Sequence, residues 1–273
     1  MLPYPLKRIV FRCAGMIATG VGIISTTVTA TELYTGAAFI TSRVGSAQLI
    51  DSTGATTALG QHDFIEISNS QIITGEDSQV YMVLTNGLAI GVGANSKLKC
   101  ARYQQAPFKP ERESLQFEPS TSVLQLELVE GTVAISCEHL SPLTEMRLQM
   151  PTGGVRLHTG TCVMRFSNAG THITAYQGTL TFYYPNGEER EFIAEPQRVR
   201  ITPQSATLGR IAEDETDQAI EANLRQLAEA TKHARTRVIF KAPDAGEKPQ
   251  AILVVPSTYY DQPSTRPYQL IDD

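Results

Sequence analysis

The sequence predicts an all-β fold with one α-helix near its C-terminal end, and three observations support this. Between residues 37 and 203, apolar runs of about five residues recur at spacings of roughly 8–12 residues, which is typical of short strands. Turn-forming pairs separate the runs, among them Asn-Gly at residues 86–87 and 186–187. Beyond Pro203 the apolar period changes to that of a helix.

The first thirty residues have the three parts of a secretory signal peptide. Lys7, Arg8 and Arg12 precede a short apolar run over residues 13–24, and the segment ends in small residues up to Ala30. A membrane-spanning helix needs about 20 apolar residues, so this run favours a signal over a retained anchor. We expect residues 1–30 to be a signal peptide cleaved after Ala30. The mature protein is then periplasmic or secreted, with no membrane insertion.

The charge of the mature chain argues against nucleic acid and anionic membranes as partners. Residues 1–30 hold three of the 23 basic residues and none of the 28 acidic ones, so 20 basic and 28 acidic residues remain, a net charge of −8. Proteins that bind phosphate backbones present a basic face. No Lys/Arg stripe is evident here, so we expect no nucleic acid and no anionic membrane as a partner.

The first strand-rich half spans about residues 37–103. Its alternating runs lie at residues 47–50, 64–67, 80–84 and 88–92. The last two flank Asn86-Gly87, which predicts a tight hairpin. A segment with Pro107, Pro110 and Pro119 follows, and we interpret residues 104–120 as a connection.

The second half spans about residues 121–203 and has the same rhythm. Predicted strands lie at residues 123–129, 131–135, 146–150, 155–157, 162–166, 172–176, 179–184, 191–193 and 199–201. Each half holds a strand pair, a glycine-containing turn and a return strand. The sequence therefore predicts a short β-solenoid or a sandwich of two similar halves.

The C-terminal region predicts a single helix and a tail. Acidic residues at 213–217 and basic residues between 232 and 237 complement a helix dipole, and Ile220, Leu224 and Leu227 form one apolar stripe. We expect an amphipathic helix over residues 211–237 that docks on the β domain. Residues 238–273 should hold short strands, near 238–240 and 251–255, and an extended or disordered tail rich in proline.

The order of several short motifs resembles that of the FecR domain of bacterial extracytoplasmic signalling. The matching stretches are residues 73–78, 80–87, 95–98, 128–133, 150–155, 160–161, 174–178 and 195–197, which together cover roughly residues 37–202. The resemblance implies an all-β, solenoid-like domain that binds protein or glycan. It also implies structural roles for six motif residues, which are Gly75, Gly87, Gly131, Gly160, Thr161 and Gly178.

The sequence departs from the family pattern at several points. A signal peptide stands where classic members have a cytoplasmic anti-sigma segment and a membrane helix. Val163 replaces the usual aromatic residue after the Gly-Thr motif, and Pro196 stands where the family has glycine. The C-terminal helix and strands are also too short to match the family's C-terminal domain. These departures put transmembrane signalling of the classic kind in doubt.

Cysteine and histidine give no clear site. An exported chain permits a disulfide among Cys100, Cys137 and Cys162, the odd count leaves at least one thiol unpaired, and three buried thiols without a bridge are the alternative. The five histidines are scattered, and Cys137-Glu138-His139 is the nearest approach to a metal-ligand cluster. We therefore expect no metal and no cofactor.

Candidate catalytic residues have simpler structural interpretations. Ser96-x-x-Lys99 fits a nucleophile motif only at a helix start, whereas these residues predict a strand. Glu188, Glu189 and Glu191 flank a hairpin, and Glu76 and Asp77 suit a solvated turn better than a calcium site. Of the neighbours Tyr183 and Tyr184, one must face outward, where it could stack on a sugar or a peptide.

The function that the sequence favours is an exported, non-catalytic binding or interaction module of the cell envelope, with an envelope protein or glycan as partner. A structural or assembly role is the alternative. An enzyme acting on envelope polysaccharide is the third hypothesis, and it requires a pair of converging carboxylates.

Overall fold

The computed structural model describes residues 33–107, 120–138, 140–185, 187, 189–202, 205–210, 218–241 and 253–256. The chain divides into two units, Met1–Thr31 and Glu32–Asp273, and all described residues lie in the second. The predicted signal peptide and most of the predicted tail therefore lie outside the described residues. No helix among the described residues is long and apolar enough to cross a membrane.

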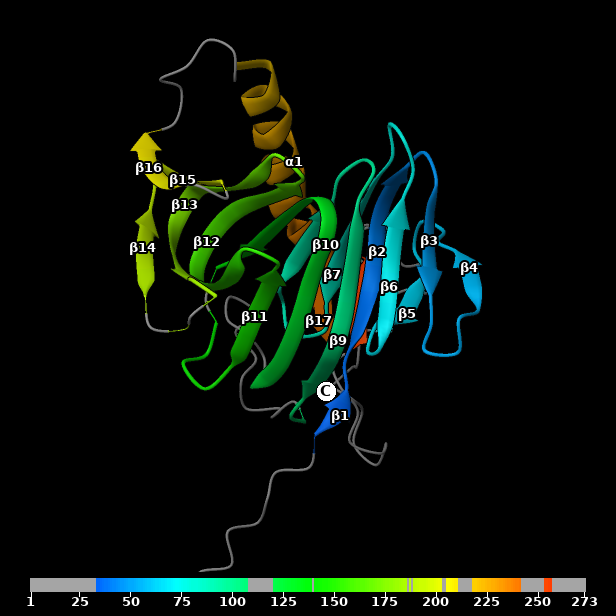
Figure 1. Cartoon of the computed structure of the whole chain (residues 1–273). Helices are drawn as coiled ribbons and strands as arrows, with labels where there is room; N and C mark the ends of the chain where they lie inside the picture. Colours follow the sequence, from blue (N-terminus) through cyan, green and yellow to red (C-terminus); the bar gives the residue numbers. More distant parts are fainter. Residues whose placement is uncertain are drawn as a thin grey trace, which may run out of the picture. The chain divides into compact units, whose positions relative to one another are not determined.

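The second unit is built from strands and one described helix (Figure 1). The strands are β1 (Tyr34–Thr35), β2 (Ala37–Val44), β3 (Ala47–Ile50), β4 (Thr56–Ala58), β5 (Phe64–Glu66), β6 (Ser70–Thr74), β7 (Gln79–Leu84), β8 (Ala89–Val92), β9 (Lys97–Gln105), β10 (Ser122–Cys137), β11 (Glu145–Met150), β12 (Gly153–Ser167), β13 (Gly170–Tyr183), β14 (Arg190–Ala194), β15 (Gln197–Thr202), β16 (Ser205–Arg210), β17 (Val238–Lys241) and β18 (Leu253–Pro256). Helix α1 spans Gln218–Thr236. The prediction of an all-β fold with one C-terminal helix is confirmed.

Strands β1–β16 form one branched sheet that folds into two layers. Layer A contains β2, β5, β7, β8, β15 and β16, with the second parts of β10 and β12 and the first part of β13. Layer B contains β3, β4, β6, β9, β11 and β14, with the remaining parts of β10, β12 and β13. Figure 1 shows β6, β9, β10 and β11 of layer B side by side.

The burial pattern tells the two layers apart. Strands β7 and β8 of layer A are buried on both faces, whereas β11 of layer B alternates strictly between exposed and buried residues. The inward side chains of both layers form one apolar cluster that includes Met82, Leu124 and Phe182. A sheet with one face in water requires alternating exposed and buried residues, as in layer B. A sheet that is covered on both faces requires continuous burial, as in β7 and β8 of layer A.

Three strands cross from one layer to the other without ending. We predicted separate strands at 123–129 and 131–135, at 155–157 and 162–166, and at 172–176 and 179–184, but each pair is one long strand. The junctions lie at Gly131, Gly160 and Gly178, whose φ angles are +95°, +103° and +74°. Glycine adopts this backbone without a Cβ clash, so each strand bends there, and the ladders shift register beside the bends.

Hydrogen bonds between neighbouring chain segments stabilise the corner, which is the region where these strands bend from one layer into the other. Ser96 is fully buried there, and its hydroxyl accepts from the Thr132 amide at 2.8 Å. The Thr74 hydroxyl donates to the Gly93 carbonyl at 2.5 Å and accepts from the Ser96 amide at 3.0 Å. Buried polar groups cost little only when they are paired in this way, so the corner fixes which segments lie next to one another.

Helix α1 covers the outer face of layer A. Its apolar side packs on β7, β8, β10 and β12 and joins Leu227, Ala228 and Ala234 to a second cluster with Tyr81 and Val163. Gly91 makes the close approach, because a Cβ there would overlap the Thr231 hydroxyl. Leu224 and Leu227 of the predicted stripe pack against the sheet, whereas Ile220 is exposed, and the described helix starts at Gln218.

Arg235 fastens the end of α1 to the sheet. Its Nε donates to the Gly87 carbonyl at 3.0 Å, and its Nη1 lies 2.9 Å from the Glu138 carboxylate. Gly87 belongs to the Asn86-Gly87 turn between β7 and β8, so the predicted hairpin is confirmed. The turn is buried, and the Asn86 amide donates a hydrogen bond to the Tyr103 hydroxyl at 2.9 Å.

Several strands were not predicted, among them β2 and β6 of the first half and β16. β16 pairs with all of β15 and extends the sheet to Arg210, beyond the predicted boundary at residue 203. The segment holds a single large apolar residue, Leu208, so its sequence gives no alternation to detect. The late strands are present as the pair β17 and β18.

We predict that Gly160→Ala destabilises the fold by at least about 3 kcal/mol, because a Cβ would overlap the Gln177 carbonyl at a left-handed backbone angle. Gly54→Ala is the matched control. Gly54 has a similar φ of +85° but no atom within 4 Å of its Cβ position, so about 1–2 kcal/mol is expected. Urea unfolding measures both, and equal losses would contradict the role of the corner.

Helix docking gives a second prediction. Leu227→Ala should cost about 2–4 kcal/mol, since Leu227 is 3% exposed in the cluster between α1 and layer A. Leu143→Ala, at a residue 78% exposed, should change stability by less than about 0.5 kcal/mol. Thermal or urea unfolding of the two variants decides the matter; a near-neutral Leu227→Ala would mean that α1 contributes little to the fold.

Candidate binding face

A hollow of about 520 Å³ opens on layer B, where β11, β12 and the end of β13 meet. Its lining includes Glu145, Arg147, Gln149, Arg156 and Tyr183. The volume lies within the range of about 300–1,000 Å³ that is typical of small-ligand sites. No described helix packs on β11, so the hollow is on the solvated side of layer B.

The strand register explains the shape of the hollow. β11 and β12 pair only at Leu148–Val155, Gln149–Gly154 and Met150–Gly153. Gly154 lies between Gln149 on one strand and Tyr183 on the other, and its missing side chain leaves a floor between them. A Cβ at this position would come within 2.9 Å of the Gln149 side-chain oxygen.

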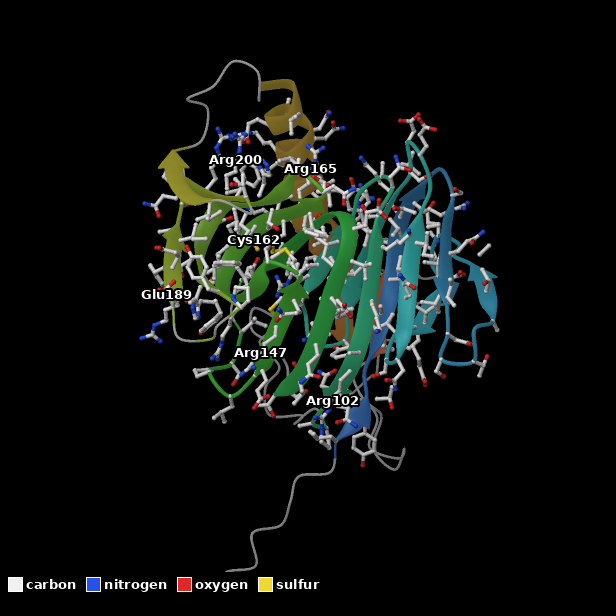
Figure 2. The ribbon with its side chains drawn as sticks, viewed as in Figure 1. Arg102, Arg147, Cys162, Arg165, Glu189 and Arg200 are labelled. Carbon is white, nitrogen blue, oxygen red and sulfur yellow. The ribbon has the colours of Figure 1, made fainter. Side chains whose placement is uncertain are left out.

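Two arginines face each other across this hollow. Arg147 and Arg156 are the next residues beyond the last pair of the ladder, Leu148–Val155, whose side chains point into the core. Both arginine side chains therefore point outward. Figure 2 marks Arg147 on β11 and Arg102 on β9 of the same layer.

The two arginines form no salt bridge with a described residue. Elsewhere on layer B, Lys97 pairs with Glu130 at 3.0 Å and Lys99 with Glu127 at 3.5 Å. Neither Arg147 nor Arg156 makes an ion pair with a described residue. Two like charges that line one hollow repel each other, so an anion bound between them would be stabilised.

Aromatic and polar groups surround the arginines. Tyr183 faces outward opposite Gly154, whereas Tyr184 packs edge-on against Phe182 with ring centroids 5.0 Å apart. The next strand adds Phe192, which is 61% exposed and 6.3 Å from the His158 ring. Burial and the nearby Arg156 charge lower the pKa of His158, so this ring is neutral at pH 7.

A second groove, of about 770 Å³, lies between the first half of α1 and the corner segments. Its lining mixes the charges of Asp77, Glu130 and Arg165 with the exposed apolar side chains of Val44 and Ile220. No single ligand chemistry is common to these groups. The hollow on layer B is therefore the better-defined candidate.

The candidate catalytic residues of the sequence do not converge in the described chain. Ser96 belongs to the corner, and Lys99 pairs with Glu127 on layer B. Glu76 and Asp77 are exposed in the turn before β7, Glu189 precedes β14, Glu191 lies within β14, and Glu188 is outside the described residues. Among described residues no three His, Cys, Asp or Glu side chains cluster as metal ligands, and His139 is not described.

The structural glycines and Thr161 occupy the corner and the turns. Gly75 follows β6, Gly87 forms the turn between β7 and β8, and Gly131, Gly160 and Gly178 lie in the bends. Thr161 is buried, with its hydroxyl 2.8 Å from that of Ser136. Sequence reasoning missed Arg147, Arg156 and Gly154, which become neighbours only through the pairing of β11 with β12.

Cys100, Cys137 and Cys162 are all buried. The disulfide that the sequence permits among Cys100, Cys137 and Cys162 is not formed in this structure. All three side chains belong to the apolar core, and Figure 2 marks Cys162 within it. Burial raises the pKa of Cys100 to about 12 and also raises that of Cys162, so neither is a thiolate at neutral pH.

Comparisons with known proteins show remote similarity alone. No family model and no curated protein matches the sequence. The chain is similar to two crystal structures of a protein from Parabacteroides distasonis ATCC 8503 named a "putative anti-sigma factor", each with a TM-score of 0.39 and 9% identity. The similarity covers 68% of this chain and 98% or 99% of the other. At these values we draw no functional conclusion from it.

Thiol reactivity tests the cysteine environment. We predict that iodoacetamide at pH 8 leaves Cys100, Cys137 and Cys162 unmodified in the folded protein and alkylates all three after unfolding without reductant, because only the thiolate reacts. Peptide mass spectrometry gives the result residue by residue. If two of the three cysteines fail to react after unfolding, they form a disulfide, which would contradict the unbridged cysteines of this structure.

Proposed function

We propose that this protein is an exported, non-catalytic, FecR-like interaction module of the bacterial cell envelope. The export signal and the motif order of residues 37–202 support the location and the family resemblance. The hollow on layer B, with Arg147 and Arg156 facing each other, is the observation that supports a binding role. Its partner is an envelope protein or glycan.

The composition of the hollow supports binding over hydrolysis. Glycoside hydrolysis uses two carboxylates about 5–9 Å apart, one to donate a proton and one to attack or activate water. Glu145 is the single carboxylate that lines the described hollow, and arginine supplies its other charges. Arginine stays protonated at physiological pH, which suits recognition of an anion better than proton transfer.

Envelope capture tests the proposed function. Immobilised mature chain, starting at Thr31, should retain a component of the envelope fraction of the organism that produces it. The double variant Arg147→Ala/Arg156→Ala should retain at least tenfold less, because charge-assisted hydrogen bonds to an anion contribute about 1.5–3 kcal/mol each. Raising the salt concentration should weaken retention by the wild type.

The matched control is Arg43→Ala, since Arg43 is exposed on β2 of layer A, away from the hollow. Its retention should equal that of the wild type. Absence of any retained envelope component, or equal retention by the double variant, would contradict the proposal. Recovery of the chain from the cytosol with residues 1–30 still attached would contradict its location.

A further inference from the structure

We infer that the hollow on layer B binds a carboxylated sugar, such as a uronic acid unit of an envelope polysaccharide. This inference rests on the proposed binding function and specifies the chemical class of its ligand. It is argued from the charges, the polar groups and the floor of the hollow.

The charge pattern favours a carboxylate over a denser anion. Arg147 and Arg156 present two planar guanidinium groups, which match the geometry of a carboxylate. Glu145 lies on the same face of β11 as Arg147, two residues away, and lines the same hollow. The charge of Glu145 offsets one of the two arginines, so the single negative charge of one carboxylate neutralises the hollow, whereas a cluster of phosphates or sulfates would leave an excess of negative charge.

The polar groups beside the arginines suit hydroxyl groups. A sugar hydroxyl both donates and accepts, so its site needs groups of both kinds. Glu145 supplies acceptors, Gln149 supplies an acceptor and donors, and the Tyr183 hydroxyl does both. A site for a simple inorganic anion has no need of the acceptors.

The floor and the aromatic wall suit a ring. Gly154 leaves an opening between Gln149 and Tyr183, and the outward Tyr183 ring borders it. The volume of about 520 Å³ is that of a small-molecule site. An extended acidic peptide would instead gain most from an edge strand, where backbone groups are unpaired, and the edge of this layer is β14.

The test uses uronate polymers as probes for the full mature chain. Polygalacturonate, alginate and hyaluronan, each with free carboxylates, are titrated against the wild type by calorimetry. We expect binding to at least one of them. Methyl-esterified polygalacturonate keeps the ring and loses the charge, so it should bind at least about tenfold more weakly than the free acid.

Three variants separate the parts of the site. Arg147→Ala/Arg156→Ala should weaken uronate binding at least about tenfold, and Arg43→Ala should leave it within about twofold. Gly154→Val should also weaken it, because the new side chain fills the floor while both arginines remain. Unfolding curves confirm that each variant is folded before it is titrated.

Failure of the sugar inference can be distinguished from failure of the proposed function in the envelope-capture experiment. Binding to none of the three uronates, or equal binding of the esterified polymer, overturns the sugar inference while an arginine-dependent envelope partner still supports the proposed function. Competition by poly-glutamate as strong as that by the uronate would assign the site to acidic peptides and overturn the inference. The inference is also overturned if vesicles of anionic lipid bind the wild type as well as the uronates do and do not bind the Arg147→Ala/Arg156→Ala variant.

Discussion

The backbone bend at the corner between the two layers is the constraint on which the rest of this structure depends. Strands β10, β12 and β13 pass through it without ending, at glycines with positive φ angles, and their ladders shift register beside these bends. The same strand therefore gives its first part to one layer and its second part to the other. Because Gly160 pairs with Gly178, two strands turn together, and the apolar side chains on both sides of the bend face one core.

The corner places the two layers on opposite sides of one core, and each layer therefore has an outer face of its own. Layer A receives α1 on its outer face, so β7 and β8 are apolar on both faces. Layer B keeps alternating strands, and its outer face carries charged and aromatic side chains. A sheet needs cover on its apolar face alone, which leaves the other face available for recognition. The candidate hollow lies on this second face, where replacing an exposed side chain has little effect on the core.

Local charge and net charge have opposite signs in this protein. The chain carries a formal net charge of −5, yet Arg147 and Arg156 lie together without an ion pair to a described residue. Lysines on the same layer are paired with glutamates, so the arginines differ from their surroundings. Grouped like charges lower stability slightly, and a ligand that neutralises them recovers that free energy on binding.

The sequence by itself determined the strand positions between residues 121 and 202, the single helix and the turn at Asn86-Gly87, because apolar periodicity and turn chemistry are local properties. The sequence drew attention to Gly131, Gly160 and Gly178 but did not show that strands bend at these residues. A glycine that ends a strand and a glycine that bends a continuous strand look alike in a sequence. Only the tertiary structure decided that the predicted strand pairs are continuous, that β16 joins the sheet, and that Arg147 faces Arg156 across Gly154. These relations depend on which strands pair and in what register, and pairing between strands is a property of the whole sheet.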